Sequence, residues 1–328
     1  MKKFGAVLLI LFLTGISCEK KEENEVTKLE GRAFGTAFHI SYYSNQDFTS
    51  EIDSLFNLIN NSLSTYIPTS DISRINSGDS SVVVDAYFTE VYNKSLKIYQ
   101  ETAGVFDPTI GILVNAWGFG PVGIKETPDS LKVGELLNLV GFDKVQLIDH
   151  KIVKENDDIY FDFNAIAKGY AVDVAGRFLE AQKIPNYLVE IGGEIRTSGE
   201  KPNGEPWKAG IEDPHFDGTR SIKKIIELKN EAMATSGSYR KFKVDSISGE
   251  KYVHILNPKT GYPTQSKLLS VSVIANLDCA DVDGYATALM AMPLEKAIQF
   301  LNDHQELKGF LIYSDAAGTL KTHTTKNF

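Results

Sequence analysis

The sequence predicts an α+β fold, because helical and strand patterns follow one another without the regular alternation that builds a parallel sheet. Apolar residues recur at helical spacing over 50–63 and 86–102. They alternate at every second position over 33–42 and 269–274, as in half-buried strands. Apolar residue types make up 42% of the 328 residues, which is enough for a substantial core.

The N-terminus is predicted to be a secretory signal peptide that covers residues 1–17. Two lysines precede an apolar run over 4–12, and this run is too short for a comfortable membrane-spanning helix. Residues 13–17 resemble the lipobox of bacterial lipoproteins, so we expect lipidation at Cys18. A conventional cleavable signal with an incidental cysteine is the alternative.

Residues 18–28 are expected to form the lipidated cysteine and a flexible tether, because 19–25 is charged and lacks apolar side chains. Export with a lipid anchor implies a place in the bacterial cell envelope, where the protein is anchored to a membrane and faces the periplasm. The sequence leaves open whether this membrane is the inner or the outer one. The remaining cysteine, Cys279, has no partner for a disulfide.

Residues 29–328 are predicted to be one domain of two packed lobes. No internal repeat, low-complexity tract or Pro- or Ser-rich linker divides this part of the chain. The net charge of −9 argues against a nucleic-acid partner, which would require a basic face.

The first half of this domain is predicted to contain a strand at 33–42, several helices and two short strands around 145–148 and 152–154. Gly35 lies inside the predicted strand 33–42 and could mark a close approach of two backbones. Helices are expected at 50–63, 70–76, 86–102 and from 127 to about 141, and Gly104 is predicted to end the third of them.

Residues 104–120 combine glycines and aromatic residues with little charge. Such a segment could be ordinary packing beneath a loop. It could also form an aromatic wall, along which glycines let a planar ligand approach the main chain. The sequence does not decide between these two interpretations.

The stretch 161–170, FDFNAIAKGY, is predicted to be a strand that leads into a helix. Helix N-termini present unpaired backbone N–H groups that can bind phosphate, and small residues allow a ligand to approach. An ordinary corner in which Asn164 caps the helix is the alternative.

The second half is predicted to be rich in strands and to end with two helices and a hairpin. Strands are expected at 187–191, 207–211, 222–228, 232–235, 240–244, 251–256 and 269–274. Helices are expected at 278–290 and 294–301, followed by a hairpin over 310–321.

Asp283 and Thr287 are candidate metal ligands. Residues four apart share one face of a helix, and a carboxylate beside a hydroxyl suits Mg²⁺. A helix start in which Asp281 or Asp283 acts as the cap explains the same residues, and it is the stronger interpretation of this segment alone.

His254 and Lys168 are weaker candidates. His254 could contact phosphate or exchange a proton near neutral pH, or it could be a half-buried strand residue. Lys168 could neutralise a phosphate, or it could be solvated. The chain has no Walker-type loop, no Gly-x-Gly-x-x-Gly after a strand and no Gly-x-Ser-x-Gly elbow.

Together, eight segments resemble the ApbE family of FAD:protein FMN transferases, also described as flavin-trafficking lipoproteins. They follow the family's order along nearly the whole mature chain, which makes the resemblance specific. The segments are FGT (34–36), STY with SDISRIN (64–76), GVFDPTIG with WGFG (104–120), DFNAIAKGYAVD (162–173), VEIGGEIRTSG (189–199), ATSGSY (234–239), HILNPKTGYP (254–263) and the helix that carries Asp283 and Thr287.

The resemblance implies an ApbE-type domain, similar to the T-fold, with FAD between two lobes. It also implies which residues form the site. The FAD-binding residues would be Phe34, Tyr66, Trp117, Gly118, Phe119, Asp162, Lys168, His254 and Ile255. Mg²⁺ would be held by Asp283, Thr287 and the Ala165 carbonyl, with Ala280 as an optional further ligand.

The implied reaction moves the FMN part of FAD to a Ser or Thr hydroxyl of an acceptor flavoprotein and releases AMP. Asp283 and His254 would be the catalytic residues. The acceptors would be membrane redox complex subunits or exported flavoproteins. A Mg²⁺-dependent FAD pyrophosphatase and a non-enzymatic flavin-binding lipoprotein are the alternatives, and the sequence names neither the acceptor nor the oligomeric state.

Overall fold

The computed structural model describes residues 25–122, 127–215, 217, 219–239, 242–244 and 251–328. The helices are α1 (Thr49–Leu63), α2 (Asp71–Asn76), α3 (Ala86–Glu101), α4 (Gly111–Ala116), α5 (Ser130–Leu137), α6 (Ala167–Ala181), α7 (Cys279–Met290) and α8 (Leu294–Asp303), with one 3-10 turn, η1 (Phe142–Lys144). None of the helices in these ranges is long and apolar enough to cross a membrane.

The strands belong to one large sheet and three hairpins. They are β1 (Val26–Ala33), β2 (Thr36–Tyr43), β3 (Val145–Ile148), β4 (Lys151–Lys154), β5 (Tyr187–Ile191), β6 (Glu194–Ser198), β7 (Trp207–Glu212), β8 (Ile222–Leu228), β9 (Ala232–Gly237), β10 (Phe242–Val244), β11 (Lys251–Val253), β12 (Leu268–Ala275), β13 (Lys308–Ser314) and β14 (Leu320–Thr324).

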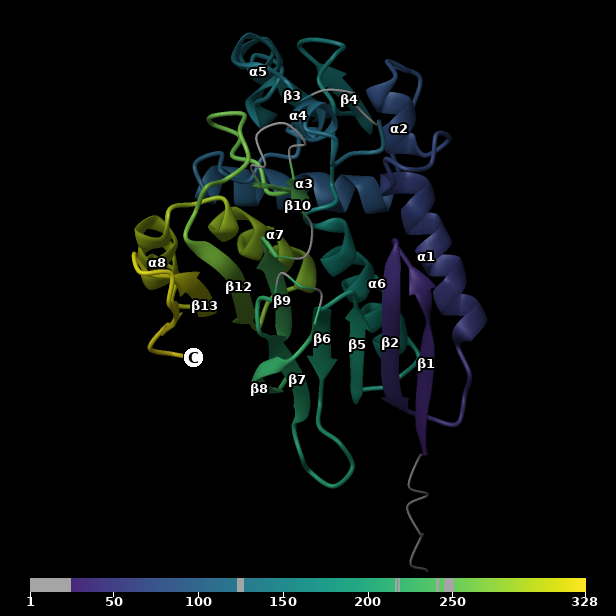
Figure 1. The fold of residues 1–328 in the computed structure, drawn as a ribbon. Helices are drawn as coiled ribbons and strands as arrows, with labels where there is room; N and C mark the ends of the chain where they lie inside the picture. Colours follow the sequence, from purple (N-terminus) through teal and green to yellow (C-terminus); the bar gives the residue numbers. More distant parts are fainter. Residues whose placement is uncertain (1–24, 123–126, 216, 218, 240–241, 245–250) are drawn as a thin grey trace, which may run out of the picture.

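The large sheet has eight strands in the order β1-β2-β5-β6-β9-β12-β13-β14 (Figure 1). Every neighbouring pair is antiparallel, as expected when strands are not linked by strand–helix–strand crossovers. The pairs β3–β4, β7–β8 and β10–β11 are separate hairpins. The predicted α+β fold class is therefore confirmed.

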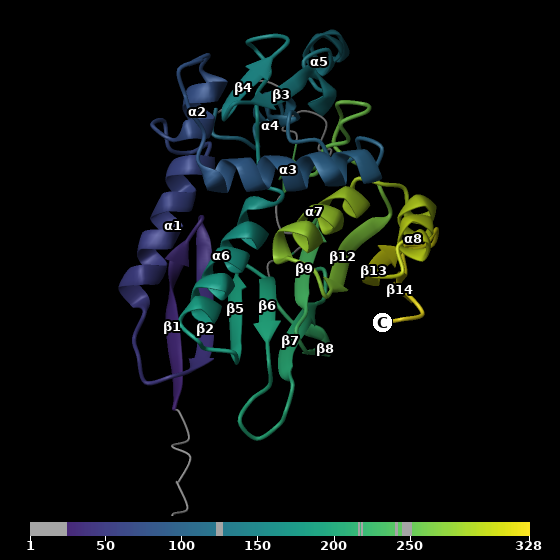
Figure 2. The same ribbon diagram turned by 180° about the vertical axis from the view of Figure 1, so that it is seen from behind.

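The sheet is covered on both faces. Helices α1, α6 and α7 lie on one face, which is seen in front in Figure 2, while the β7–β8 hairpin lies on the other (Figure 1). Alternate residues of the strands serve two cores: Val273 of β12 belongs to the large helix-side core, and its neighbour Ile274 packs with the hairpin. Burial on both faces explains why β12 contains apolar residues and two serines but no charged side chain.

A smaller lobe lies beyond α3, which runs across one end of the sheet (Figures 1 and 2). It contains α2, α4, α5 and the β3–β4 hairpin. Its own apolar cluster is formed by Leu113, Trp117, Val133, Leu136, Val140 and Leu256. Leu256 follows β11, so the second half of the chain contributes to the packing of this lobe.

Three local predictions were wrong. The strand expected at 33–42 is two strands joined by a turn at Phe34 and Gly35, whose φ angles of 51° and 75° suit a tight hairpin. No atom lies within 4 Å of a Cβ built on Gly35, so this glycine permits a turn and not a close approach. Strand β1 begins at Val26, which pairs with Tyr43, so the tether does not extend to residue 28.

The stretch 161–170 also differs from its prediction. Phe161 and Phe163 are buried, but this segment forms no ladder of strand hydrogen bonds, and α6 begins only at Ala167. Asn164 is exposed and does not cap the helix. Instead, the Asp162 carboxylate accepts a 2.7 Å hydrogen bond from the Asn164 N–H and stabilises the turn before α6.

Helices α6 and α7 approach closely at Gly169. A Cβ built on this glycine would lie 2.5 Å from the Cys279 carbonyl oxygen and 2.8 Å from the Asp283 Cβ. Both neighbouring atoms belong to the backbone or to the stem of a side chain, so they cannot move aside easily. Glycine at this position therefore sets the distance between the two helices.

Replacement Gly169→Ala should lower the free energy of unfolding by about 1–3 kcal/mol, because the methyl group forces the helices apart. Urea unfolding of both proteins measures the change. The control is Gly134→Ala in α5, where a Cβ meets no atom within 4 Å. That replacement should stabilise the protein by about 0.5–1 kcal/mol, since alanine favours helix. Equal effects of the two replacements would contradict the prediction.

Candidate functional site

The candidate site lies where α7 faces the first turn of α6. Asp283 and Thr287 are one turn apart on α7, as the sequence predicts for residues four apart. The Asp283 side chain is buried, and Thr287 is half-buried. The Thr287 hydroxyl shares a 3.1 Å hydrogen bond with the hydroxyl of Ser236 in β9. The structure thus presents a carboxylate and a hydroxyl on one side of the helix.

The first turn of α6 contacts this face of α7 directly. The Gly169 N–H donates to Asp283 Oδ2 over 3.1 Å. Lys168 Nζ lies 3.9 Å from the same oxygen and 2.8 Å from Oε1 of Glu194, the first residue of β6. Ala165 lies two residues before α6, in the turn that leads into this helix. Asp283, Lys168 and Glu194 therefore form one charged group, in which both carboxylates are buried and the lysine is half-buried.

This group carries excess negative charge. The side chains of Asp283 and Glu194 are each 4% exposed, and both face the single ammonium of Lys168. Burial raises the pKa of Asp283 to about 7; Lys168 opposes this rise, and the Glu194 carboxylate adds to it. Glu194 Oε2 is buried and has no hydrogen-bond partner among the described residues. An orphaned carboxylate oxygen beside a second carboxylate fits a divalent cation.

The donor set suits Mg²⁺ better than a transition metal. Within the described residues, no three His, Cys, Asp or Glu side chains are grouped as metal ligands. A cation here would instead use the Asp283 carboxylate, the Thr287 hydroxyl and the Ala165 carbonyl. These are hard oxygen donors, and Mg²⁺ fills its remaining positions with water or substrate phosphate. Ala280 is buried, and its N–H is already bonded to Asp173.

Two of the predicted flavin-site residues, Tyr66 and Asp162, lie near each other. Burial and then the Asp162 carboxylate raise the pKa of the Tyr66 phenol. The two residues differ in access, because Tyr66 is 56% exposed whereas Asp162 is 8% exposed. Phe34, at the tip of the β1–β2 hairpin, packs edge-on against Phe56 of α1 with the ring centroids 5.3 Å apart.

A second group joins the segment after α4 to the loop after β11. Trp117 Nε1 donates a 2.8 Å hydrogen bond to the Gly261 carbonyl, and the Trp117 ring lies 5.8 Å from that of Tyr262. Phe119 packs edge-on against His254, with ring centroids 6.4 Å apart. Trp117 is buried, so packing explains it, whereas Phe119 and His254 are only half-buried.

Gly118 and Ile255 complete the second group. Gly118 has φ of 73°, which permits the turn between the two aromatic residues. Ile255 is buried next to His254. The structure thus divides the predicted site into the α6–α7 charged group, the Tyr66–Asp162 pair and the Phe119–His254 contact. Cys18, the predicted lipidation site, lies outside the described residues.

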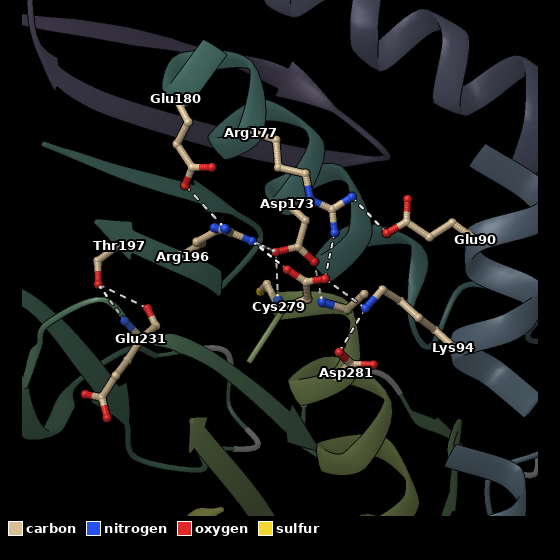
Figure 3. Close-up of polar contacts among 12 residues, drawn as sticks. Glu90, Lys94, Asp173, Arg177, Glu180, Arg196, Thr197, Glu231, Cys279 and Asp281 are labelled. Atoms are coloured by element: carbon tan, nitrogen blue, oxygen red, sulfur yellow. Dashed lines mark hydrogen bonds and ion pairs between the residues drawn. The ribbon is translucent and has the colours of Figure 1, made fainter. Parts of the chain in front are cut away.

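Sequence reasoning gave no role to two residues that the structure places at or beside the site. Glu194 follows two glycines with φ of 63° and 105°, which turn the chain between β5 and β6. Asp173 lies four residues after Gly169 on α6 and is bonded to the start of α7 (Figure 3). The spacing of 169 and 173 on one predicted helix face was the available signal for Asp173.

The fold and the charged group define an α+β protein with two buried carboxylates and a lysine at the crossing of two helices. A family model described as the ApbE family matches residues 34–311, so the chain belongs to this family. Both the resemblance found in the sequence and the ApbE-type fold are thereby confirmed.

Known proteins support this assignment along nearly the whole chain. An FAD:protein FMN transferase of Haemophilus influenzae is 35% identical over 91% of this chain and 90% of its own length. An FAD:protein FMN transferase of Vibrio cholerae is 36% identical over 92% of this chain and 90% of its own length. The solved flavin transferase ApbE from Vibrio cholerae has a TM-score of 0.82 at 33% identity, and covers 93% of this chain and 98% of its own. The apo flavinyl transferase ApbE from Pseudomonas stutzeri has a TM-score of 0.83 at 30% identity, over 93% and 96%.

The role of the charged group can be tested by metal binding alone, without an assay of the reaction. Replacement Glu194→Gln removes one of the two buried negative charges, so Mn²⁺ or Mg²⁺ affinity should fall by about tenfold or more. Isothermal titration measures the affinity. The matched control is Glu231→Gln, which also removes a glutamate paired to one lysine, Lys308 at 2.6 Å. An unchanged affinity in Glu194→Gln would mean that Glu194 serves only to hold Lys168.

Proposed function

We propose that this protein transfers the FMN part of FAD to a Ser or Thr hydroxyl of an acceptor flavoprotein. The observation that carries the proposal is the charged group of Asp283, Lys168 and Glu194 at the centre of an ApbE fold. The relatives named as FAD:protein FMN transferases match about nine-tenths of both chains, which supports the same reaction here.

The reaction forms one phosphoester bond and breaks one phosphoanhydride bond. The acceptor oxygen attacks the phosphorus on the riboflavin side of FAD, the hydroxyl proton is released, and AMP leaves. Such transfers depend mainly on positioning and on neutralising charge. The Lys168 side chain is 30% exposed and lies beside Asp283, and its ammonium would pair with an anionic phosphate.

Mg²⁺ is part of the proposal. Asp283, Thr287 and the Ala165 carbonyl would hold the ion, with the Ala280 carbonyl as a further ligand. Bound there, the ion would neutralise pyrophosphate charge. His254 would contact the phosphate or accept the proton, and Asp162 would hold a polar edge of the flavin nucleotide. Phe34, Tyr66, Trp117, Gly118, Phe119 and Ile255 would line the rest of the FAD site.

In the decisive experiment, the protein is incubated with FAD, Mg²⁺ and an acceptor flavoprotein. We expect flavin fluorescence that remains on the acceptor after denaturation, and AMP in equal amount. Asp283→Ala should reduce the rate by at least about 100-fold, because it removes the charged ligand from the proposed metal site. Removal of Mg²⁺ by EDTA should have the same effect on the wild-type protein.

Other outcomes distinguish the alternatives. Free FMN and AMP without labelled acceptor would indicate an FAD pyrophosphatase, in which water replaces the acceptor hydroxyl. FAD that stays intact with Mg²⁺ and several acceptors would indicate a flavin-binding protein. Either result would refute the proposed transfer.

We further propose that the protein is exported and anchored by lipid at Cys18, facing the periplasm. Its acceptors would then be membrane redox complex subunits or exported flavoproteins. The proposal is supported by the short apolar run and the lipobox-like residues that precede this cysteine.

Replacement Cys18→Ser should move the protein from the membrane fraction to the soluble fraction, because a serine cannot accept the thioether-linked lipid. Fractionation of cells and labelling with radioactive palmitate measure the change. Wild-type protein that is soluble and unlabelled would contradict the lipid anchor and favour a conventional cleaved signal.

A further inference from the structure

The start of α7 is bonded in an unusual way. The N-cap residue is Asp278, a type that normally accepts a hydrogen bond from the first turn of its own helix, but its side chain makes no such bond. Asp278 instead faces three cations, Lys94 at 2.9 Å, Arg177 at 2.6 Å and Arg196 at 2.8 Å. The first N–H groups of α7 therefore need another partner.

Asp173 of α6 is that partner. Its Oδ1 accepts from the Cys279 N–H and its Oδ2 from the Ala280 N–H, each over 2.8 Å (Figure 3). The residue is fully buried. Because one rigid carboxylate accepts hydrogen bonds from two consecutive N–H groups, it restricts both the position of the helix end and its rotation. Negative charge is also favoured at a helix N-terminus.

The bonds made by Asp173 lie one turn before the candidate metal ligands. Cys279, Asp283 and Thr287 are spaced four apart on α7, so they lie along one face. On α6, Gly169 and Asp173 are also four apart, and each is bonded to α7. Two consecutive turns of α6 thus hold two consecutive turns of α7, and a shift at Asp173 would displace Asp283.

Strand β6 connects Asp173 and Asp278 to the sheet through Arg196. Arg196 Nη1 donates to Asp173 Oδ1 and to Asp278 Oδ1, each over 2.8 Å. Glu194, which pairs with Lys168, is two residues earlier and so points to the same side of the strand. One strand therefore supports both the charged group and the carboxylate that holds the start of α7.

We propose that Asp173 is a positioning residue that caps α7 from α6 and thereby fixes Asp283 and Thr287 relative to the Ala165 carbonyl. This inference rests on the proposed metal-dependent function. Groups that orient metal ligands typically contribute 10–100-fold to affinity. Loss of the Asp173 carboxylate should therefore weaken divalent-cation binding, while saturating metal should restore most of kcat.

The test compares Asp173→Asn with a matched charge removal in the same network. An asparagine can accept only one of the two bonds, because its amide nitrogen is a donor. The control is Glu90→Gln: Glu90 of α3 bonds Tyr170 and Arg177, each at 2.8 Å, and both of these partners belong to α6. Mn²⁺ binding to the mature chain is measured by electron paramagnetic resonance at a temperature where all proteins are folded.

We expect Asp173→Asn to weaken Mn²⁺ binding at least about tenfold. The KM for Mg²⁺ in the transfer assay should rise in parallel, with kcat within about threefold of the wild-type value. Glu90→Gln should bind Mn²⁺ within about twofold of wild type, even if it is less stable. Mn²⁺ affinity that is equal in Asp173→Asn and wild type would overturn the proposal.

Two further outcomes are possible: the variant does not fold, or the wild-type protein binds no metal. If Asp173→Asn does not fold, Arg196→Gln disturbs the same contact, because Arg196 orients Asp173 Oδ1, the oxygen that accepts from the Cys279 N–H. That variant should bind Mn²⁺ about threefold or more weakly, and unchanged binding would refute the positioning role. If the wild-type protein binds no Mn²⁺ or Mg²⁺, the metal site of the proposed function fails, and the positioning role fails with it.

Discussion

The close crossing of α6 and α7 is the constraint on which the candidate site depends. At Gly169 there is no room for a Cβ between the helices, and the glycine N–H is bonded to the Asp283 carboxylate. One turn later, Asp173 holds the first two N–H groups of α7. These contacts bring Lys168 and the Asp283 carboxylate together, although the two helices are about a hundred residues apart in the sequence. The apolar faces of both helices pack on the same sheet, which keeps the crossing fixed.

The cost of burying so many charges is offset by their arrangement. Removing one partner of a buried ion pair leaves an uncompensated charge and is typically costly, whereas a fully bonded network is tolerated. Around the start of α7, Lys94, Arg177 and Arg196 are each bonded to Asp278. These pairs lower the pKa of Asp278 to about 2 against the opposing effect of burial. The Asp283–Glu194 group is different: in the described part of the chain, Lys168 faces both carboxylates, and one Glu194 oxygen has no hydrogen-bond partner. The cations around Asp278 are thus each bonded to a carboxylate, whereas the group beside them keeps one Glu194 oxygen without a partner among the described residues.

Much of the fold could be predicted from local patterns. Helix α1 and strand β5 occur almost where the apolar periodicity places them, because each buries one regular stripe or face. Predictions failed where the chain leaves regular structure. The hairpin at Phe34 and Gly35 depends on two positive φ angles, and alternation alone does not reveal them. The sequence before α6 alternates like a strand, yet its buried phenylalanines pack in the core and are not assigned to any strand.

The sequence by itself determined the α+β class, the family and the residue types available for a metal and a phosphate. It did so because helix and strand periods, glycine turns and ordered motifs are local properties of the chain. The tertiary structure alone decided that Glu194 joins Lys168 and Asp283, that Asp173 and not Asp281 or Asp283 caps α7, and that Trp117 is buried in the smaller lobe. Each of these facts depends on which residues from distant segments are brought within bonding distance. That distance is set by how helices and strands pack, and no spacing within one segment encodes it.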